Sequence, residues 1–210
     1  LKVWAELGFS FDVVSTGMIL SAEQAALVSD FCEQSAKKGA LVFVDPIMGD
    51  EGKLYNGVGE ETIAHMRKMV AVADCIVPNY TEAAYLADVP YHEDMTEEEA
   101  RALTIRLHEM GAKSVVVTSA KVDGENCVVG YDGTEGEFFR IPFDLIPVRF
   151  VGTGDIFAAV MLGRLVDGVP LQESTHRAMD AVRTMIDRNR DKEDKYLGIP
   201  IETCLEVLDE

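Results

Sequence analysis

The sequence predicts an α/β fold, a three-layer α/β/α sandwich with a mostly parallel sheet. Short apolar runs such as 40–44 do not alternate with polar residues, which is typical of strands buried on both faces of a parallel sheet. Segments with helical periodicity separate these runs, as in βαβ units. Each run ends in polar residues, so we expect them to gather at one edge of the sheet, where such folds bind ligands.

Helix signals separate the expected strands. Ser21 with Gln24, and Thr96 with Glu99, each have the spacing of a capping box, in which two side chains satisfy N–H groups at a helix start. Gly39 and Gly111 stand where helix ends belong. The expected strands are 11–17, 40–44, 74–77 and 114–119, and the expected helices are 21–38, 60–72, 96–110, about 155–166, 171–188 and 201–208.

An antiparallel hairpin is expected near residues 126–141. The segments 126–131 and 137–141 alternate between apolar and polar residues around the turn sequence Asp132–Gly136. This hairpin would extend the parallel sheet.

Composition indicates one domain over residues 1–210. The chain has 210 residues, 48% of them hydrophobic, and no convincing linker. Its net charge of −18 argues against nucleic acid or an anionic membrane as a partner, but not against a nucleotide that arrives with Mg²⁺. No apolar run reaches the length of a membrane span and no signal peptide is visible. Four cysteines without CxxC spacing read as reduced core residues of a cytoplasmic protein.

A glycine turn before the helix at 155–166 predicts an anion site. Gly152 and Gly154, which flank Thr153, can take backbone conformations closed to residues with a Cβ atom, and a helix start directs N–H groups and a positive dipole end at one point. Asp155 is placed to accept a proton from an attacking hydroxyl while those amides stabilise the developing charge. The alternative is an ordinary helix start, where Asp is common.

Carboxylates at the strand ends predict a magnesium site. Asp45 and Asp50 lie in a loop rich in glycine after strand 40–44, and hard cations prefer carboxylate oxygens. Glu82 lies in the first turn of a helix after strand 74–77, on the same expected edge. The alternatives are turn chemistry for the loop and dipole complementarity for Glu82.

Three stretches together resemble the pyridoxal/pyridoxine kinase branch of the ribokinase-like superfamily, in order from about Phe11 to about Arg188. These stretches are Asp45-Pro46-Ile47-Met48-Gly49-Asp50 with Gly52-Lys53-Leu54-Tyr55, then Pro78-Asn79-Tyr80-Thr81-Glu82-Ala83, and then Gly152-Thr153-Gly154-Asp155. The resemblance implies transfer of the γ-phosphoryl group of MgATP to the 5′-hydroxymethyl group of pyridoxal, pyridoxine or pyridoxamine.

The same resemblance implies roles for single residues. Asp155 would deprotonate the hydroxyl, and Gly152, Thr153 and Gly154 would form the anion hole. Asp45, Asp50 and Glu82 would arrange Mg²⁺, with K⁺ or Na⁺ as a further cation. The nucleotide would contact Asp45, Val77, Asn79, Glu82, Thr118 and Ser119, and the vitamin would contact Asp155 and Tyr55. A homodimer is also implied.

Two departures from the family pattern matter. Val77 stands where the family usually has Thr or Ala, which leaves only its backbone carbonyl for a monovalent cation. Nothing before Leu1 corresponds to the N-terminal strand and loops that supply part of the vitamin pocket.

Other functions remain as alternatives. Hydroxymethylpyrimidine kinases share the Asp-Pro and Pro-Asn stretches but typically have Cys at position 155, and sugar kinases share Gly-Thr-Gly-Asp but usually differ around 45–55. A non-catalytic regulator that binds a nucleotide or pyridoxal phosphate is the alternative from another class.

Overall fold

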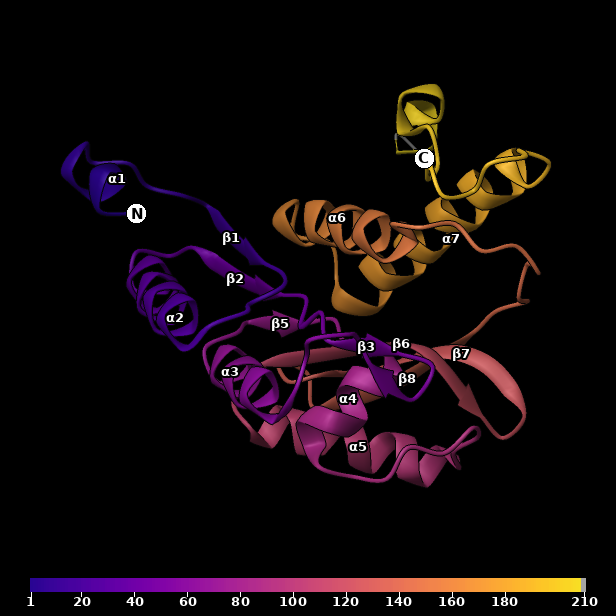
Figure 1. The fold of residues 1–210 in the computed structure, drawn as a ribbon, viewed down its shortest axis with the longest axis horizontal. Helices are drawn as coiled ribbons and strands as arrows, with labels where there is room; N and C mark the ends of the chain where they lie inside the picture. Colours follow the sequence, from indigo (N-terminus) through magenta and orange to yellow (C-terminus); the bar gives the residue numbers. More distant parts are fainter. Residues whose placement is uncertain (209–210) are drawn as a thin grey trace. The chain divides into compact units, whose positions relative to one another are not determined.

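The chain forms two compact units, which we call unit 1, Leu1–Phe143, and unit 2, which begins at Asp144. The computed structural model describes residues 1–208 (Figure 1). The single domain expected over 1–210 stays a prediction.

Unit 1 is built on a six-stranded sheet with the order β1-β2-β5-β6-β7-β8. The pairs β1–β2, β2–β5 and β5–β6 are parallel, and β6–β7 and β7–β8 are antiparallel. This confirms the α/β class with a mostly parallel sheet and the antiparallel hairpin. The strands are β1 (Val13–Thr16), β2 (Leu41–Val44), β5 (Cys75–Ile76), β6 (Ser114–Val122), β7 (Glu125–Asp132) and β8 (Glu137–Pro142).

The strand register brings the carboxyl ends of β1, β2 and β5 to one edge of this sheet. Thr16 is paired with Val44, and Val44 is paired with Ile76. A parallel bridge between Asn79 and Thr118 continues this edge beyond β5. The loops that follow β1, β2 and β5 therefore start side by side, as predicted.

Four helices of unit 1 cover one face of its sheet (Figure 1). Alternate residues of the parallel strands, such as Val42, Val44, Val115 and Val117, face these helices in a common core. The helices of this unit are α1 (Lys2–Glu6), α2 (Ala22–Ala36), α3 (Glu60–Val70), α4 (Tyr80–Ala87) and α5 (Glu97–Glu109), of which α2 to α5 form the layer. The placement of α6 and α7 as the second helical layer of a sandwich stays a prediction.

β6 is longer than the sequence predicts. A bulge between Val117 and Ala120 interrupts its pairing with β7, and Ser119 adopts a left-handed conformation there, with a φ of 55°. The strand resumes after the bulge and runs to Val122. The expected strand end at Ser119 was therefore wrong, because polar residues at a bulge resemble a strand terminus in sequence.

A small hairpin occupies part of the loop expected after β2. β3 (Gly49–Asp50) pairs antiparallel with β4 (Lys53–Leu54). The turn residues Glu51 and Gly52 have φ angles of 52° and 76°, and positive φ at both central positions is typical of a type I′ turn.

Unit 2 contains α6 (Thr153–Val166) and α7 (Leu171–Asn189), which pack against each other. Phe150, Ile156 and Met185 belong to its core. The α-helix expected over 201–208 is wrong, because two 3₁₀ turns lie there, η1 (Ile201–Thr203) and η2 (Leu205–Leu208). Cys204 separates them with a φ of −130°, which breaks a continuous helix.

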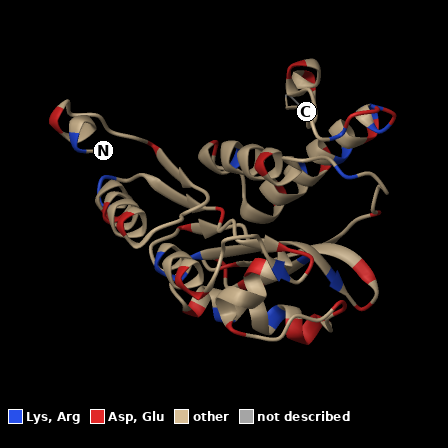
Figure 2. Ribbon diagram, viewed as in Figure 1, with Lys and Arg blue, Asp and Glu red and all other residues tan. Residues whose placement is uncertain are grey.

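The burial of the cysteines and the distribution of the acidic residues agree with what the composition predicts. All four cysteines are free and buried, as expected for core residues. Acidic residues are spread over helices and loops throughout the chain and do not form a tail (Figure 2). Within residues 1–208, no helix has the length and apolar character needed to cross a membrane.

Candidate active site

The loop after β2 begins with Asp45 at the carboxyl edge of the unit 1 sheet. Its backbone N–H donates to the carbonyl of Thr16, at 3.0 Å, so the edge of β1 fixes where the loop departs. The side chain is half-buried. A carboxylate is thereby held where the parallel strands end.

Asn79 and Glu82 form a capping box at the start of α4. The Asn79 Oδ1 atom accepts from the Glu82 N–H at 3.0 Å, and the Glu82 Oε2 atom accepts from the Asn79 N–H at 2.9 Å. The other end of each side chain reaches the loop after β2: the Asn79 Nδ2 atom donates to the Gly49 carbonyl, and Glu82 Oε1 accepts from the Met48 N–H. The box therefore connects α4 to the loop that carries Asp45 and Asp50.

Glu82 is a buried carboxyl group, with 3% of its surface exposed. Burial raises its pKa to about 7, and the neighbouring Asp45 carboxylate also raises it. Hydrogen bonds from the N–H groups of Met48, Asn79 and Gly49 lower this pKa, because they stabilise the charged form, and they partly offset the effect of burial. Each oxygen of Glu82 accepts a backbone N–H group, so the side chain holds the loop after β2 against the start of α4.

Asp50 and Tyr55 lie on and just after the β3–β4 hairpin. The Asp50 Oδ1 atom accepts from the N–H of Glu51 at 2.9 Å, and the Tyr55 N–H donates to the Met48 carbonyl at 2.9 Å. The Tyr55 side chain is 44% exposed.

The other predicted nucleotide residues of unit 1 lie along the same edge. The Thr118 N–H donates to the carbonyl of Pro78, and Ser119 follows in its bulge with an exposed side chain. Val77 is buried and donates its N–H to Val44. The structure thus brings Asp45, Val77, Asn79, Glu82 and Thr118 to one edge, with the hairpin attached to it.

Two residues near this edge carry contacts that the sequence analysis missed. Thr81 Oγ1 accepts from the Gly52 N–H at 2.8 Å, and the Tyr85 hydroxyl lies 3.5 Å from the Gly52 carbonyl. The four-residue spacing shows that 81 and 85 share a helix face. Nothing in the sequence shows that a hairpin lies against that face.

The glycine turn of unit 2 has the geometry of an anion site. Gly152 is the N-cap of α6 with a φ of 84°, and it has no side chain to cap the first N–H groups of the helix. The amides of Thr153 and Gly154 lie at that helix start. Of the two glycines, only Gly152 has a positive φ, so the expectation of a special backbone conformation at Gly154 is wrong, because Gly154 already lies within the first helical turn.

Asp155 lies in the first turn of α6 and its side chain is exposed. Its Oδ2 atom is 3.8 Å from the position that a Cβ atom on residue 152 would occupy. The carboxylate therefore lies beside the glycine turn, as a base acting next to the anion hole requires.

The donor chemistry of unit 1 fits magnesium bound jointly with phosphate oxygens. Across residues 1–208, no three His, Cys, Asp or Glu side chains group closely enough to hold a metal ion by themselves. Mg²⁺ in nucleotide sites takes one or two protein carboxylates and completes its shell with phosphates and water. Asp45 and Asp50 fit that role, whereas Glu82 fits a supporting one.

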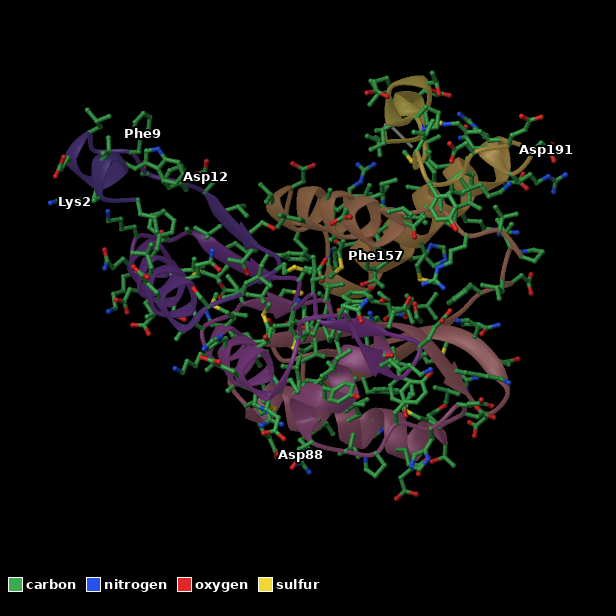
Figure 3. All side chains as sticks on the ribbon, viewed as in Figure 1. Lys2, Phe9, Asp12, Asp88, Phe157 and Asp191 are labelled. Carbon is green, nitrogen blue, oxygen red and sulfur yellow. The ribbon has the colours of Figure 1, made fainter. Side chains whose placement is uncertain are left out.

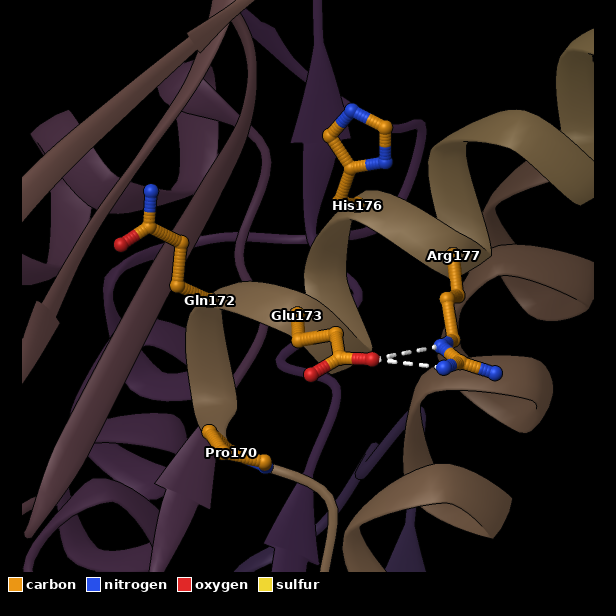
Figure 4. A pocket seen from close by; sticks show the side chains of 5 residues that line it. All are labelled: Pro170, Gln172, Glu173, His176 and Arg177. Carbon is orange, nitrogen blue, oxygen red and sulfur yellow. Dashed lines mark hydrogen bonds and ion pairs between the residues drawn. The ribbon is translucent and has the colours of Figure 1, made fainter.

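A pocket at the start of α7 lies apart in sequence from the predicted site residues. Its lining residues are Pro170, Gln172, Glu173, His176 and Arg177 (Figure 4). Within it, Glu173 Oε1 accepts from Arg177 Nη2 at 2.6 Å. None of these lining residues is among the site residues that the sequence predicts.

Comparison with known proteins gives a family match along most of the chain. The family model described as phosphomethylpyrimidine kinase matches residues 5–198. The pyridoxal kinase of Arabidopsis thaliana is 32% identical over 171 residues, which cover 78% of this chain and 53% of that protein. The chain spans about half the length of the curated relatives that it matches.

Solved structures agree with this match. A Bacteroides thetaiotaomicron protein assigned to the phosphomethylpyrimidine kinases is 33% identical with a TM-score of 0.95, covering 100% of this chain and 73% of that one. An orthorhombic crystal form of this Bacteroides thetaiotaomicron protein contains pyridoxal. The pyridoxal kinase of Lactobacillus plantarum is 27% identical with a TM-score of 0.85, covering 99% of this chain and 74% of that one. The resemblance inferred from the three motifs is confirmed.

Proposed function

Since this chain belongs to the phosphomethylpyrimidine kinase family, we propose that it transfers the γ-phosphoryl group of ATP to the 5′-hydroxymethyl group of pyridoxal, pyridoxine or pyridoxamine. The observation that carries the proposal is the left-handed glycine turn that opens α6 with Asp155 beside it. The pyridoxal found in the similar Bacteroides structure supports this choice of substrate.

In this reaction Asp155 accepts the proton of the substrate hydroxyl. The hydroxyl oxygen then attacks the γ-phosphorus, the bond to the β-γ bridging oxygen breaks, and ADP leaves. The N–H groups of Thr153 and Gly154, with the Gly152 turn, stabilise the charge on the transferring phosphoryl group. Tyr55, which is 44% exposed after the hairpin, is proposed as a residue that contacts the vitamin, as the family resemblance implies.

The residues of the unit 1 edge bind the nucleotide. Asn79, Thr118 and Ser119 contact it with polar groups, and Val77 contributes its backbone carbonyl. Asp45 and Asp50 hold Mg²⁺, with Glu82 as the support that fixes their loop. When bound, Mg²⁺ neutralises phosphate charge. K⁺ or Na⁺ is proposed as an additional cation at this edge.

A coupled ADP-release assay on the full-length protein tests this function. We expect ADP release with pyridoxal and Mg²⁺, and little release without a vitamin. Absence of turnover with all three vitamers, in protein that still binds pyridoxal phosphate or a nucleotide, would favour the non-catalytic regulator.

Hydroxymethylpyrimidine phosphorylation is the second candidate, because the matching family model is described as phosphomethylpyrimidine kinase. Asp155 favours pyridoxal, since hydroxymethylpyrimidine kinases typically have Cys at that position. The same assay, run in parallel with hydroxymethylpyrimidine and with a sugar such as ribose, ranks these substrates by kcat/KM.

We also propose a cytoplasmic homodimer. The buried, unbridged cysteines fit a reducing compartment. Exposed apolar side chains on and after α1, including Val3, Trp4, Leu7 and Phe9, offer a surface that dimerisation would cover. A monomer mass by light scattering at micromolar concentration would contradict the dimer.

A further inference from the structure

The β3–β4 hairpin is held by α4 at two separate points. At its base, the Asn79 Nδ2 atom donates to the Gly49 carbonyl at 2.7 Å, and the Glu82 carboxylate accepts from the N–H of Met48 at 2.9 Å. At its tip, Thr81 Oγ1 accepts from the Gly52 N–H at 2.8 Å. The base contacts come from the capping box, whereas the tip contact comes from a neighbouring face of the same helix.

Gly52 is enclosed at this tip. Its φ of 76° disfavours a side chain, and a Cβ atom there would come within 2.9 Å of the Tyr91 ring. Tyr91 is stacked on Tyr80 of α4, with ring centroids 4.9 Å apart. The Tyr85 hydroxyl also approaches the Gly52 carbonyl, at 3.5 Å.

Thr81 makes a shorter hydrogen bond to Gly52 than Tyr85 does, at 2.8 Å against 3.5 Å. Its side chain is buried, with 2% exposed, so the Gly52 N–H has a protected acceptor. Gly52 is partly buried, so loss of this hydrogen bond from its N–H is expected to cost about the free energy that corresponds to a tenfold change in an equilibrium constant. The turn would then exchange this contact for water and move away from α4.

We propose that Thr81 is a positioning residue, whose hydroxyl fixes the hairpin tip so that Asp50 keeps its place for the nucleotide-bound cation. Asp50 is the last residue of β3 and is separated from Gly52 only by Glu51, so a displaced tip moves its carboxylate. The effect on activity rests on the proposed kinase function. The effect on the position of the hairpin does not depend on that function.

Two measurements on the full-length protein test the proposal. In hydrogen exchange followed by mass spectrometry, Thr81→Val is expected to speed exchange in peptides that cover 49–54 by about tenfold. In the ADP-release assay, it is expected to raise the KM for MgATP about tenfold with less than a twofold change in kcat. Thr81→Ser keeps the hydroxyl and is expected to restore both values.

Thr104→Val is the matched control. Thr104 is also a fully buried helical threonine, but its hydroxyl donates to the carbonyl of Arg101 in its own helix, at 2.9 Å. This variant is expected to change neither exchange over 49–54 nor the KM for MgATP. Tyr85→Phe, which removes the longer contact to the same glycine, is expected to give a smaller change in the direction of Thr81→Val and serves if Thr81→Val does not fold.

Unchanged exchange over 49–54 in both Thr81→Val and Tyr85→Phe would overturn the proposal. So would an equal rise of KM in Thr104→Val, or failure of Thr81→Ser to restore the hairpin. If the wild-type protein phosphorylates no vitamin, the proposed function fails, while the exchange experiment still decides whether Thr81 holds the hairpin.

Discussion

The Oε1 atom of Glu82 accepts a hydrogen bond from the backbone N–H of Met48 at 2.9 Å, which ties a helix start to a loop 34 residues earlier in the chain. Its Oε2 atom accepts from the N–H of Asn79 at the same distance. A carboxylate with these contacts is best satisfied when ionised, yet its burial favours the neutral form.

Glu82 should therefore make stability depend on pH. Its pKa is about 7 in the folded chain against an ordinary value of 4.5, so the folded state binds this proton more tightly between those two values. The contribution of Glu82 to stability is fully present below the ordinary value and is lost as pH rises through about 7. As pH rises from the ordinary pKa to the folded-state pKa and beyond, the free energy of unfolding of the wild type minus that of Glu82→Gln should fall by roughly 3 kcal/mol.

Urea unfolding at pH 5 and pH 8 without added Mg²⁺ measures this difference. Subtracting Glu82→Gln removes the effect of the other acidic residues, which titrate in both proteins. A difference that is constant with pH, or that rises with pH, would contradict the assignment.

The two glycines that flank Thr153 should respond in opposite ways to alanine. Gly152→Ala forces an L-residue into a left-handed conformation and should lower the free energy of unfolding by about 1–2 kcal/mol. Gly154 has no positive φ, and a Cβ atom there meets nothing within 4 Å, so Gly154→Ala should raise stability by up to about 1 kcal/mol in the absence of ligand.

Nucleotide binding separates these two effects. Because both positions form the proposed anion hole, each variant should bind ATP more weakly in calorimetry, although only Gly152→Ala is less stable. If both variants lost stability, the placement of Gly154 in the first helical turn of α6 would be contradicted.

The sequence predicted the parallel sheet edge because that edge depends on local signals. Buried runs ending in polar residues identified Asp45, Asn79 and Thr118, and parallel pairing brings such ends together. The capping box of Asn79 and Glu82 has the same three-residue spacing as that of Thr96 and Glu99, but the sequence analysis predicted Glu82 as a magnesium carboxylate, with a helix-dipole role as the alternative, and did not identify the box.

The hairpin contacts could not be predicted in the same way. β3 and β4 are two residues long each, which is too short for alternating hydrophobicity to indicate a strand. The turn residues Glu51 and Gly52 between them also suit an irregular loop. The bond from Gly52 to Thr81 joins residues 29 apart in sequence, and only the folded chain shows which helix face the turn meets. Likewise, the roles of Asp155 and of the magnesium carboxylates stay predictions.

Arg140 should be a major contributor to the stability of the antiparallel part of unit 1. Its Nη2 atom donates to the carbonyl of Val122 at 2.7 Å and to Glu125 Oε2 at 2.8 Å, and its side chain is only 18% exposed. Arg140→Met leaves a carbonyl and carboxylates without this partner, so the free energy of unfolding should fall by about 1–3 kcal/mol.

Arg190→Ala is the control for Arg140, measured by the same urea titration. Arg190 pairs with Asp187 at 3.2 Å, but both side chains are more than half exposed. A solvent-exposed pair contributes less than about 1 kcal/mol. Equal losses in the two variants would show that the partly buried network adds nothing beyond a surface ion pair.

In unit 1, Asp88, labelled in Figure 3, is the C-cap of α4 and has a left-handed conformation with a φ of 54°. Aspartate is one of the few residues other than glycine that adopt this conformation, so a structural role at the helix end accounts for Asp88. Asp155 lies in the first turn of a helix, where a purely structural role is equally ordinary, so only a variant that separates shape from proton transfer can assign it.

Asp155→Asn makes that separation. Asparagine keeps the size and much of the hydrogen bonding of aspartate, so stability should change by less than about 1 kcal/mol, but it cannot accept the substrate proton. Turnover of pyridoxal should fall by roughly 10²–10⁴, with the affinity for ATP little altered, because a positioned base acts in the transition state. Asp167→Asn is the matched control, since Asp167 is exposed at the other end of the same helix, and it should keep wild-type turnover. If Asp155→Asn turned over pyridoxal at nearly the wild-type rate, Asp155 would be only a helix-start residue, and the proton would have to leave through water or directly to phosphate.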